Sequence, residues 1–343
     1  MRDEPVARLR DLGEDAVIEA IRRILPESAA GVVVGIGDDA AILECPSGRH
    51  LVLTVDTLVE GVHFRHGWAT AADVGYKALA VSISDIAAMG GLPRQAVVSV
   101  VAPASTPVEW VEGLYRGLAD AGARFAVSVV GGNLARTEGP VVVDVAALGE
   151  VEPELCLRRS GARPGDAVVV TGTLGRARGG LIALERGMQD PAWEPLVRAY
   201  RRPSPRLREA RAVASCRWAT AMMDISDGLA LDLSRMCAAS GVGVCLDAEA
   251  LPVDPALRAL AERLDEDAVA LALGGGEDYE LLVAVPPDRA PAQVAILQSE
   301  AGTPAAVVGV FTPPAEGRTV VHRGVRRPLP AGGWDHFRGG GDR

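Results

Sequence analysis

The sequence predicts a two-domain protein of mixed α/β (α+β) class, and three observations support this fold class. The chain has 343 residues, and at roughly 150 residues per domain this length indicates two domains. Strand-like apolar runs and helix-like stretches follow one another in both halves. A polar stretch from Val151 to Arg163 continues into Arg163-Pro164-Gly165-Asp166 and separates the halves. We therefore expect domains at 1–150 and 151–338, followed by a disordered tail at 339–343.

The first half is predicted to mix helices with strands. Glu14 to Leu25 carries its apolar residues on one stripe and is typical of an amphipathic helix. The long uncharged stretch that begins at Ala71 predicts a second helix, closed by Gly90-Gly91-Leu92-Pro93. The expected elements, in order, are a helix at 14–25, strands at 31–37 and 50–56, a helix at 71–89, a strand at 96–102, a helix at 107–121, a short buried strand at 127–130 and a strand at 141–149.

The second half shows a similar mixture. Apolar runs rich in β-branched residues predict its strands, and the stretches after Gly175 and Gly228 predict helices. The expected elements are strands at 167–171, 219–224, 280–285, 305–310 and 319–322, with helices at 176–185 and 228–239. Pro203, Pro205 and the arginines around them predict an exposed connector.

Charge and composition exclude several classes of function. The net charge is −10, which argues against nucleic acid or an acidic membrane as a partner. Lys77 is the only lysine among the 35 basic residues and lies in Gly75-Tyr76-Lys77-Ala78. The chain therefore has no G-x-x-x-x-G-K-[ST] loop and no protein-kinase set of motifs. Any phosphate chemistry must use metal ions, arginine or backbone amides.

The cysteines and the apolar runs indicate a protein of the cytoplasm. The five cysteines are widely spaced, odd in number and lack a C-x-x-C pattern, which fits free thiols in a reducing compartment. The N-terminus is polar and is not typical of a signal peptide. No uncharged apolar run reaches the ~18–20 residues of a membrane span.

Acidic residues gather where apolar strands are predicted to end. Asp38 and Asp39 follow one strand, Asp56 follows the next, and Asp224 and Asp227 follow a third, while Asp85 lies in an otherwise uncharged stretch. Each alone can be a turn residue or a helix cap. Together they favour a site where loops bring carboxylates around Mg²⁺, because this ion prefers oxygen ligands and bridges to phosphates.

The glycine loops are less specific. Gly131-Gly132-Asn133 follows an apolar run and can present backbone N–H groups to a phosphate. Gly172-Thr173-Leu174-Gly175 can do the same, although a tight strand-to-helix turn is the favoured interpretation. No nucleophile elbow and no Ser-His-Asp or Cys-His signature is present. The sequence therefore indicates metal-assisted group transfer without a covalent protein nucleophile.

Six motifs, in order from about residue 12 to 337, resemble those of the thiamine-monophosphate kinase family. They are Gly37-Asp38-Asp39-Ala40-Ala41, Asp56-Thr57-Leu58-Val59-Glu60-Gly61-Val62-His63-Phe64, Lys77-Ala78-Leu79-Ala80-Val81-Ser82-Ile83-Ser84-Asp85-Ile86-Ala87-Ala88-Met89-Gly90, Asp224-Ile225-Ser226-Asp227-Gly228-Leu229, Gly275-Gly276-Glu277-Asp278-Tyr279-Glu280-Leu281 and Gly333-Trp334-Asp335-His336-Phe337. The resemblance implies the two-domain fold of aminoimidazole ribonucleotide synthetase, with N-terminal domains that pair through a β-barrel into a homodimer. It also implies transfer of a phosphoryl group from ATP to thiamine monophosphate, with several Mg²⁺ ions.

The resemblance also assigns site residues. It implies metal ligands at Asp39, Thr54, Asp56, Asp85, Asn133, Asp224 and Asp227. It implies ATP contacts at Tyr115, Gly132, Asn133, Arg159 and Ser226, and substrate contacts at His63, Glu277 and Trp334. Lys77 is expected to lie on the helix surface or to pair with a carboxylate, and not to act as a catalyst.

Two positions depart from the family pattern. Asn133 stands where the family has an aspartate, which removes one negative charge and predicts weaker binding of one Mg²⁺. Val55 replaces a hydroxyl residue between Thr54 and Asp56. These changes leave open a catalytically weakened, ligand-binding paralogue as the alternative. Another ATP-dependent enzyme of the superfamily is also open, although a selenophosphate synthetase lacks support because no Cys or Lys precedes Asp38.

Overall fold

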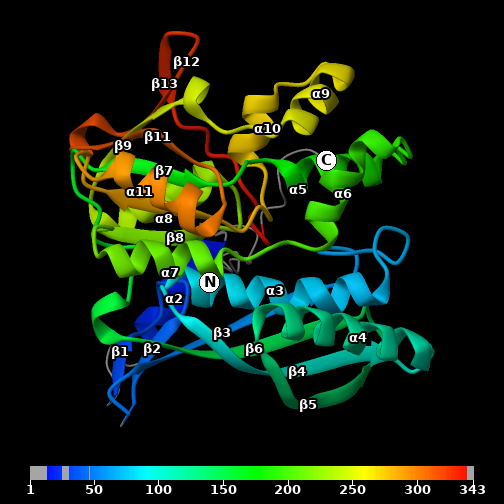
Figure 1. Cartoon of the computed structure of the whole chain (residues 1–343). Helices are drawn as coiled ribbons and strands as arrows, with labels where there is room; N and C mark the ends of the chain where they lie inside the picture. The colour runs from blue at the N-terminus through cyan, green and yellow to red at the C-terminus, as the bar shows by residue number, and fades with distance from the viewer. Residues whose placement is uncertain (1–13, 25–30, 46, 338–343) are drawn as a thin grey trace, which may run out of the picture.

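The chain folds into two β-sheets with helix α3 between them (Figure 1). This computed structural model describes residues 14–24, 31–45 and 47–337. The mixed α/β class with one sheet in each half is confirmed. Neither sheet is closed within the chain, so the dimeric barrel stays a prediction. Leu25 and the predicted tail at 339–343 lie outside the described residues.

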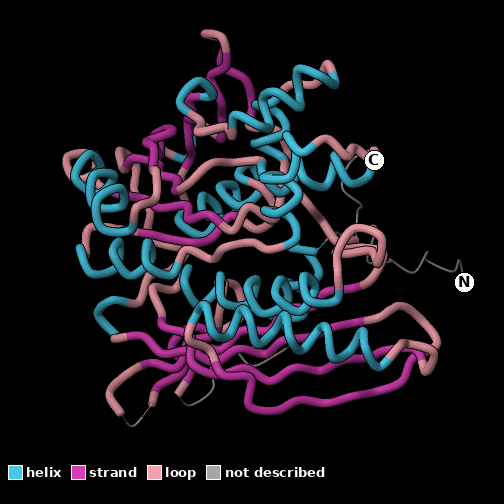
Figure 2. The backbone as a smooth tube through the Cα atoms, turned by 45° about the vertical axis from the view of Figure 1, so that its right-hand side comes forward, coloured by secondary structure: helices cyan, strands magenta, loops and turns pink. Residues whose placement is uncertain are grey.

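The first sheet has six strands and is covered by helices on one face only. Helices α3 (Ala71–Ala88) and α4 (Val108–Phe125) lie on that face, and no described helix covers the other (Figure 2). Only β4 and β5 run parallel. The strands, in spatial order, are β1 (Val32–Val34), β2 (Ala41–Glu44), β3 (His50–Val59), β6 (Val142–Val151), β4 (Leu92–Pro103) and β5 (Ser128–Thr137).

The second sheet has seven strands, and only β9 and β12 run parallel. Its strands, in spatial order, are β13 (Val325–Pro328), β12 (Arg318–His322), β9 (Gly243–Asp247), β11 (Ala305–Thr312), β7 (Ala167–Thr171), β10 (Glu280–Val285) and β8 (Ala221–Ile225). The other helices are α2 (Glu14–Ile24), α5 (Arg176–Glu185), α6 (Glu194–Arg201), α7 (Leu207–Cys216), α8 (Leu229–Ser240), α9 (Pro255–Leu264), α10 (Ala268–Gly274) and α11 (Ala290–Ile296). Short helical turns occupy Pro153–Leu155, Pro191–Trp193, Ala248–Ala250, Leu297–Ala301 and Pro314–Glu316.

Helix α3 is apolar almost all round, as expected for a helix that is buried on every side. Fourteen of its eighteen residues are buried. It begins with a capping box, in which the backbone N–H of Asp73 donates to Thr70 Oγ1 at 3.1 Å and the Thr70 N–H donates to Asp73 Oδ2 at 3.2 Å. This arrangement satisfies two N–H groups that a helix start leaves without intrahelical partners. Helix α3 contacts β3 and β6 on one side and β8 and α7 on the other.

Two glycines bring α3 and α4 into backbone contact. A Cβ atom at Gly75 would lie 1.9 Å from the Leu114 carbonyl oxygen, and one at Gly117 would lie 1.8 Å from that of Ala72. Both distances are far inside van der Waals contact. Any side chain at either position would therefore force the two helices apart.

The two halves also share packing. Tyr279 belongs to the second half, yet its buried side chain lies in the core of the first sheet. Ala87 of α3 packs in a third cluster with Val213, Met222 and Leu281 from the second half. The domain interface is thus a continuous core, and side chains from both halves can be held against one another firmly.

Several local predictions are wrong. Asp56 and Asp224 lie within strands β3 and β8, because backbone pairing continues past them. Strand β5 does not end at residue 130, nor is it buried. It is an exposed edge strand that continues through Gly131 and Gly132, because its parallel pairing with β4 supplies the backbone hydrogen bonds.

The predicted connector is wrong as well. Pro203 and Pro205 are buried, and helix α7 begins two residues later. Seven further elements were not predicted from the sequence: β2, α6, α9, α10, α11, β9 and β13. In the part of the chain that the structure describes, no helix has both the length and the apolar character of a membrane span.

We predict that Gly117→Ala lowers the free energy of unfolding by roughly 1–3 kcal/mol, the usual cost of overpacking a core. The new Cβ would meet the Ala72 carbonyl and push α3 from α4. Gly274→Ala is the control, because Gly274 is also a helical glycine, the last residue of α10, but a Cβ atom there would have nothing within 4 Å. The control should lose no stability, since alanine favours a helix over glycine. Chemical denaturation of both variants checks this, and equal effects would contradict it.

Candidate active site

Four buried carboxylates from both halves meet around the C-terminal half of α3. Burial, reinforced by the negative charges of Asp56, Asp224 and Asp39, raises the pKa of Asp85 well above its usual range. Burial and the charge of Asp39 likewise raise the pKa of Asp224. Such mutual effects require the groups to lie close together. The structure therefore brings together Asp39, Asp56, Asp85 and Asp224, as the sequence predicted.

Hydroxyl groups fix the orientation of two of these carboxylates. Thr54 Oγ1 on β3 donates to Asp85 Oδ2 at 2.5 Å. Ser84 Oγ on α3 donates to Asp224 Oδ2 at 2.6 Å. Asp85 thereby links α3 to the first sheet, and Ser84 links it to the second sheet.

Two carboxylate oxygens in this cluster are buried and lack a hydrogen-bond partner among the described residues. They are Asp39 Oδ2 and Asp56 Oδ2. Burial raises the pKa of Asp56 to about 6. An unpaired buried oxygen is costly, and a hard cation would satisfy it. The oxygen-rich set therefore fits Mg²⁺. Within the described ranges, however, no group of three or more His, Cys, Asp or Glu side chains is arranged so that it could hold a metal ion as it stands.

Arg159 neutralises the loop of Asp38 and Asp39. Its guanidinium donates to Asp39 and lies 3.6 Å from Asp38 Oδ1. Asp38 Oδ1 also accepts the backbone N–H groups of Asp39 at 3.0 Å and Arg159 at 3.2 Å. Burial and the charge of Asp39 still raise the pKa of Asp38 to about 6. The predicted nucleotide contact thus lies directly beside a predicted metal ligand.

A second arginine, which the sequence reasoning missed, lies at Asp227. Arg235 on α8 donates to Asp227 and, at 3.1 Å, to Asp232 Oδ1. Asp232 Oδ2 accepts the backbone N–H groups of Asp227 at 3.0 Å and Gly228 at 3.1 Å. Asp232 and Arg235 lie one helical turn apart, three residues on the same face. This i, i+3 spacing of an acid and an arginine, soon after Ser226-Asp227-Gly228, is the sequence signal that could have identified Arg235 as a partner of Asp227.

The three predicted substrate residues lie in one chain of contacts. Trp334 Nε1 donates to His336 Nδ1 at 3.0 Å, and the rings of His336 and His63 are 5.2 Å apart. Lys77 Nζ lies 2.6 Å from Glu277 Oε1 and 3.3 Å from the His63 carbonyl oxygen. Lys77 is buried, so it does not lie on the helix surface, but its expected pairing with a carboxylate is confirmed.

Two further contacts tie these residues to the carboxylates. The backbone N–H of Trp334 donates to the Asp227 carbonyl oxygen at 2.9 Å. The backbone N–H of Glu277 donates to the Ser226 carbonyl oxygen at 2.6 Å. Asp227 and Ser226 are themselves predicted metal and nucleotide contacts. The segments that carry Trp334 and Glu277 are therefore fixed by the same Ser226-Asp227 turn.

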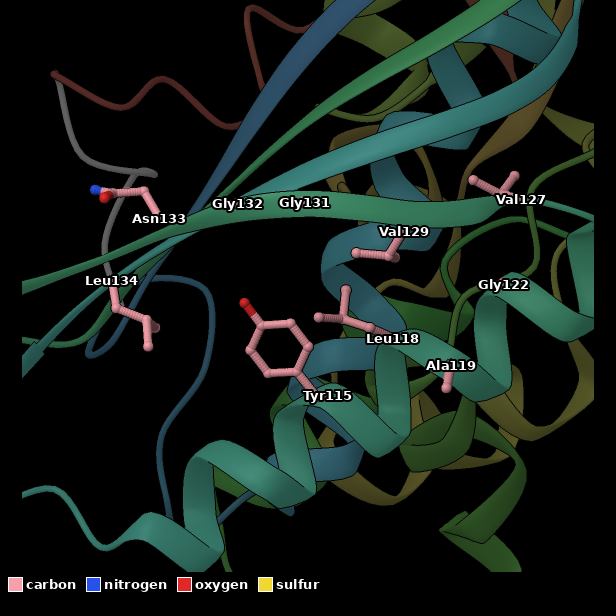
Figure 3. A pocket seen from close by; sticks show the side chains of 10 residues that line it. All are labelled: Tyr115, Leu118, Ala119, Gly122, Val127, Val129, Gly131, Gly132, Asn133 and Leu134. Atoms are coloured by element: carbon pink, nitrogen blue, oxygen red, sulfur yellow. The ribbon is translucent and has the colours of Figure 1, made fainter.

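A separate groove of about 740 Å³ lies between α4 and β5. It is lined by Tyr115, Gly132 and Asn133, three of the predicted ATP contacts, and by apolar residues of both elements (Figure 3). The Asn133 side chain points away from the Tyr115 ring (Figure 3). Strands β6 and β4 separate β5 from β3. Within one chain, Asn133 is thus not placed among the other predicted metal ligands.

Comparisons with known proteins show the family of the chain. Residues 37–151 match the N-terminal domain of AIR synthase related proteins, and residues 163–322 match their C-terminal domain. Thiamine-monophosphate kinase of Aquifex aeolicus is 38% identical over 82% of this chain and 89% of that protein. The Escherichia coli K12 enzyme is 36% identical over 95% of this chain and 98% of that protein. The chain belongs to the thiamine-monophosphate kinase family.

A solved structure of a relative extends the agreement to three dimensions. AaThiL complexed with AMPPCP and TMP aligns with a TM-score of 0.85 at 35% identity, covering 97% of this chain and 100% of that one. The resemblance found from the six motifs is thereby confirmed at the level of the whole fold.

In this member of the thiamine-monophosphate kinase family, Asp278 anchors the loop that carries Glu277. Its carboxylate accepts the backbone N–H of Gly175 at 2.7 Å and that of Ala177 at 3.5 Å, at the start of α5. These N–H groups are thus already occupied, which supports the tight-turn interpretation of Gly172–Gly175. Burial raises the pKa of Asp278 to about 8.

We predict that Asp278→Asn becomes increasingly stable relative to the wild type as the pH rises from 5 to 8. The folded protein holds a proton on Asp278 that the unfolded chain releases above about pH 4. The wild type therefore loses stability through this window, by up to about 1.4 kcal/mol per pH unit, and the variant does not. Denaturant titrations at several pH values check this. A stability difference that stays constant with pH would contradict it.

Proposed function

We propose that the chain transfers the γ-phosphoryl group of ATP to the phosphate of thiamine monophosphate, giving thiamine diphosphate and ADP. The observation that carries this proposal is the cluster of buried carboxylates drawn from both halves around α3. The family relatives share this activity, which favours it over a non-catalytic paralogue. Because the described site offers no activated nucleophile, the transfer is direct and in line.

The carboxylate cluster is proposed to bind Mg²⁺. Asp39, Thr54, Asp56, Asp85, Asp224 and Asp227 would hold the ions. Asn133 lies apart from them within one chain, so it would be a further, weaker ligand only from a second copy of the chain in the proposed homodimer. When bound, the ions supply positive charge that neutralises the crowded phosphate oxygens. The unpaired oxygens of Asp39 and Asp56 support this assignment.

ATP is proposed to contact Tyr115, Gly132, Asn133, Arg159 and Ser226. Gly132 allows β5 to lie close against β4, since a Cβ atom there would lie 2.0 Å from the Val98 carbonyl oxygen. Arg159 is held close to Asp39 and presents a planar cation suited to phosphate. Once Asp39 has another cationic partner, Arg159 is free to pair with the nucleotide.

Thiamine monophosphate is proposed to contact His63, Glu277 and Trp334. Burial lowers the pKa of His63 to about 4, so the ring is neutral at pH 7. His63 Nδ1 accepts the backbone N–H of Val59 at 3.0 Å, which places the ring proton on Nε2. His63 therefore offers a neutral hydrogen-bond donor to the substrate.

The five free thiols support a reducing, cytoplasmic setting.

We predict that the purified protein forms thiamine diphosphate from ATP and thiamine monophosphate only when Mg²⁺ is present. Asp85→Asn should lower kcat by about 100-fold or more, because it removes one of the charged ligands that would hold Mg²⁺ against the phosphate oxygens. Its melting temperature should not fall, since the change relieves repulsion among buried carboxylates. Product analysis and thermal unfolding measure both effects.

A matched control is Asp166→Asn. Asp166 is also buried and accepts a threonine hydroxyl, from Thr220 at 2.6 Å, but it lies outside the site. This variant should keep its turnover. An inactive wild type combined with an active Asn133→Asp variant would contradict the proposal and support the weakened paralogue.

The homodimer is proposed to form through the uncovered face of the first sheet. Leu53, Val55 and Val97 are 41%, 64% and 45% exposed, and they alternate with residues that face α3 and α4. Apolar residues gathered on an open sheet face indicate an interface. The proposed N-terminal domain, residues 1–150, would thus provide dimerisation as well as ATP and Mg²⁺ binding. Residues 151–338 would complete the nucleotide and substrate site.

We predict that Leu53→Glu converts the protein from a dimer to a monomer, because the new charge would be buried in the interface. Val310→Glu is the matched control, since Val310 is a strand residue of equal exposure, 40%, on the second sheet. Sedimentation velocity should show a dimer for the wild type and the control. A monomeric wild type would contradict the proposed interface.

A further inference from the structure

Lys77 is the only lysine of the chain, and its side chain is 3% exposed. Its ammonium group lies 2.6 Å from Glu277 Oε1 and 3.3 Å from the carbonyl oxygen of His63. It also lies 4.0 Å from the centre of the Tyr200 ring, a cation–π distance. The group is thus enclosed by one carboxylate, one carbonyl and one aromatic face.

These contacts come from both halves of the chain. Lys77 belongs to α3 and His63 to the loop after β3, whereas Tyr200 lies on α6 and Glu277 follows α10. The Tyr200 hydroxyl donates to the same His63 carbonyl oxygen, at 2.9 Å. Lys77 and Tyr200 therefore both fix the His63 carbonyl group. Of these two residues, Lys77 also contacts the carboxylate of Glu277.

Stability gives little reason for a buried ion pair at this place. Taking the Lys77 ammonium out of water costs about as much as its attraction to the Glu277 carboxylate returns, and an apolar residue of similar size often does as well or better. A methionine would fill most of the same space without that cost. The pairing is better explained by what it does to Glu277 and His63.

Glu277 needs such support because its backbone is strained. Its φ angle is 67°, and that of Tyr279 is 50°, both in the left-handed region that favours glycine. Strained residues persist where their surroundings fix them, and they are common at functional sites. The Glu277 carboxylate is 23% exposed, so it meets Lys77 on one side and remains open on the other.

We propose that Lys77 is a positioning residue that sets the affinity for thiamine monophosphate. It orients the Glu277 carboxylate and the His63 loop, which are the two substrate contacts on either side of it. Its contacts are with Glu277, the His63 carbonyl and the Tyr200 ring, and not with the carboxylates that gather at Asp85. The inference rests on the proposed kinase function, because it assumes that Glu277 and His63 meet the substrate.

The test compares steady-state kinetics of the wild type, Lys77→Met and Lys77→Arg, with each substrate varied in turn. Lys77→Met should raise KM for thiamine monophosphate about tenfold or more, the effect expected from losing a charged hydrogen bond. KM for ATP should stay within about twofold. Lys77→Arg keeps the cation and should recover part of the lost affinity. If all these values stay at the wild-type level, the proposal is overturned.

Arg211→Gln provides the matched control. Arg211 Nη1 also joins the two halves by donating to a carbonyl oxygen, of Gly90 at 2.8 Å, and to a carboxylate, of Glu152 at 2.9 Å. This pair lies away from the proposed substrate contacts. The control can lower thermal stability but should leave both KM values unchanged. Equal shifts of both KM values in the Lys77 variants would indicate a purely structural role and overturn the proposal.

A double-mutant cycle with Glu277→Gln shows whether Lys77 acts through Glu277. The double variant should raise KM for thiamine monophosphate no more than the larger single change, and fully additive effects would overturn the proposal. If Lys77→Met does not fold, Lys77→Arg and Glu277→Gln carry the same test. A wild type without turnover in this assay refutes the kinase function itself, whereas an active wild type with unaffected Lys77 variants refutes only this inference.

Discussion

Helix α3 lies between two sheets and is buried on almost every side, so each polar side chain it carries must find a partner within the protein. Ser82 donates to the Val145 carbonyl at 3.2 Å on the first sheet. Ser84 donates to Asp224 on the second sheet, and Asp85 accepts from Thr54 on the first. These hydrogen bonds position the site, because they fix α3 against both sheets, and two of the contacted strands, β3 and β8, carry other site residues.

The same burial concentrates negative charge that the chain cannot relieve by hydration. Burial raises the pKa of Asp39 and Asp56, and neighbouring carboxylates add to this effect at Asp85 and Asp224. Arg159 and Arg235 compensate only the edges of the cluster, at Asp39 and Asp227. Among the described residues, no arginine or lysine neutralises the middle of the cluster, at Asp85 and Asp224.

The sequence predicted the elements whose pattern is strongly periodic or uniformly apolar, such as α2, α3 and β10. It also predicted that the aspartates converge, since apolar surroundings make isolated carboxylates costly. It failed where tertiary contacts decide the structure. Nothing local signals that strand pairing continues past Asp56, or that Pro203 and Pro205 are buried beside Arg206, whose bidentate pairing with Glu280 fixes that segment. The role of Arg235 as a partner of Asp227 was not predicted, because an arginine on a helix is ordinarily interpreted as a solvated charge.

The arginines and the single lysine of the site bind different partners because their cations differ in shape. Arg159 meets two carboxylates and Arg235 meets three, which a planar guanidinium with several donors can span. The ammonium of Lys77 is compact, and its environment is a closed space bounded by Glu277, the His63 carbonyl and the Tyr200 ring. A guanidinium would need more room there. The single lysine is therefore found where a small buried cation is required, and phosphate binding falls to other groups.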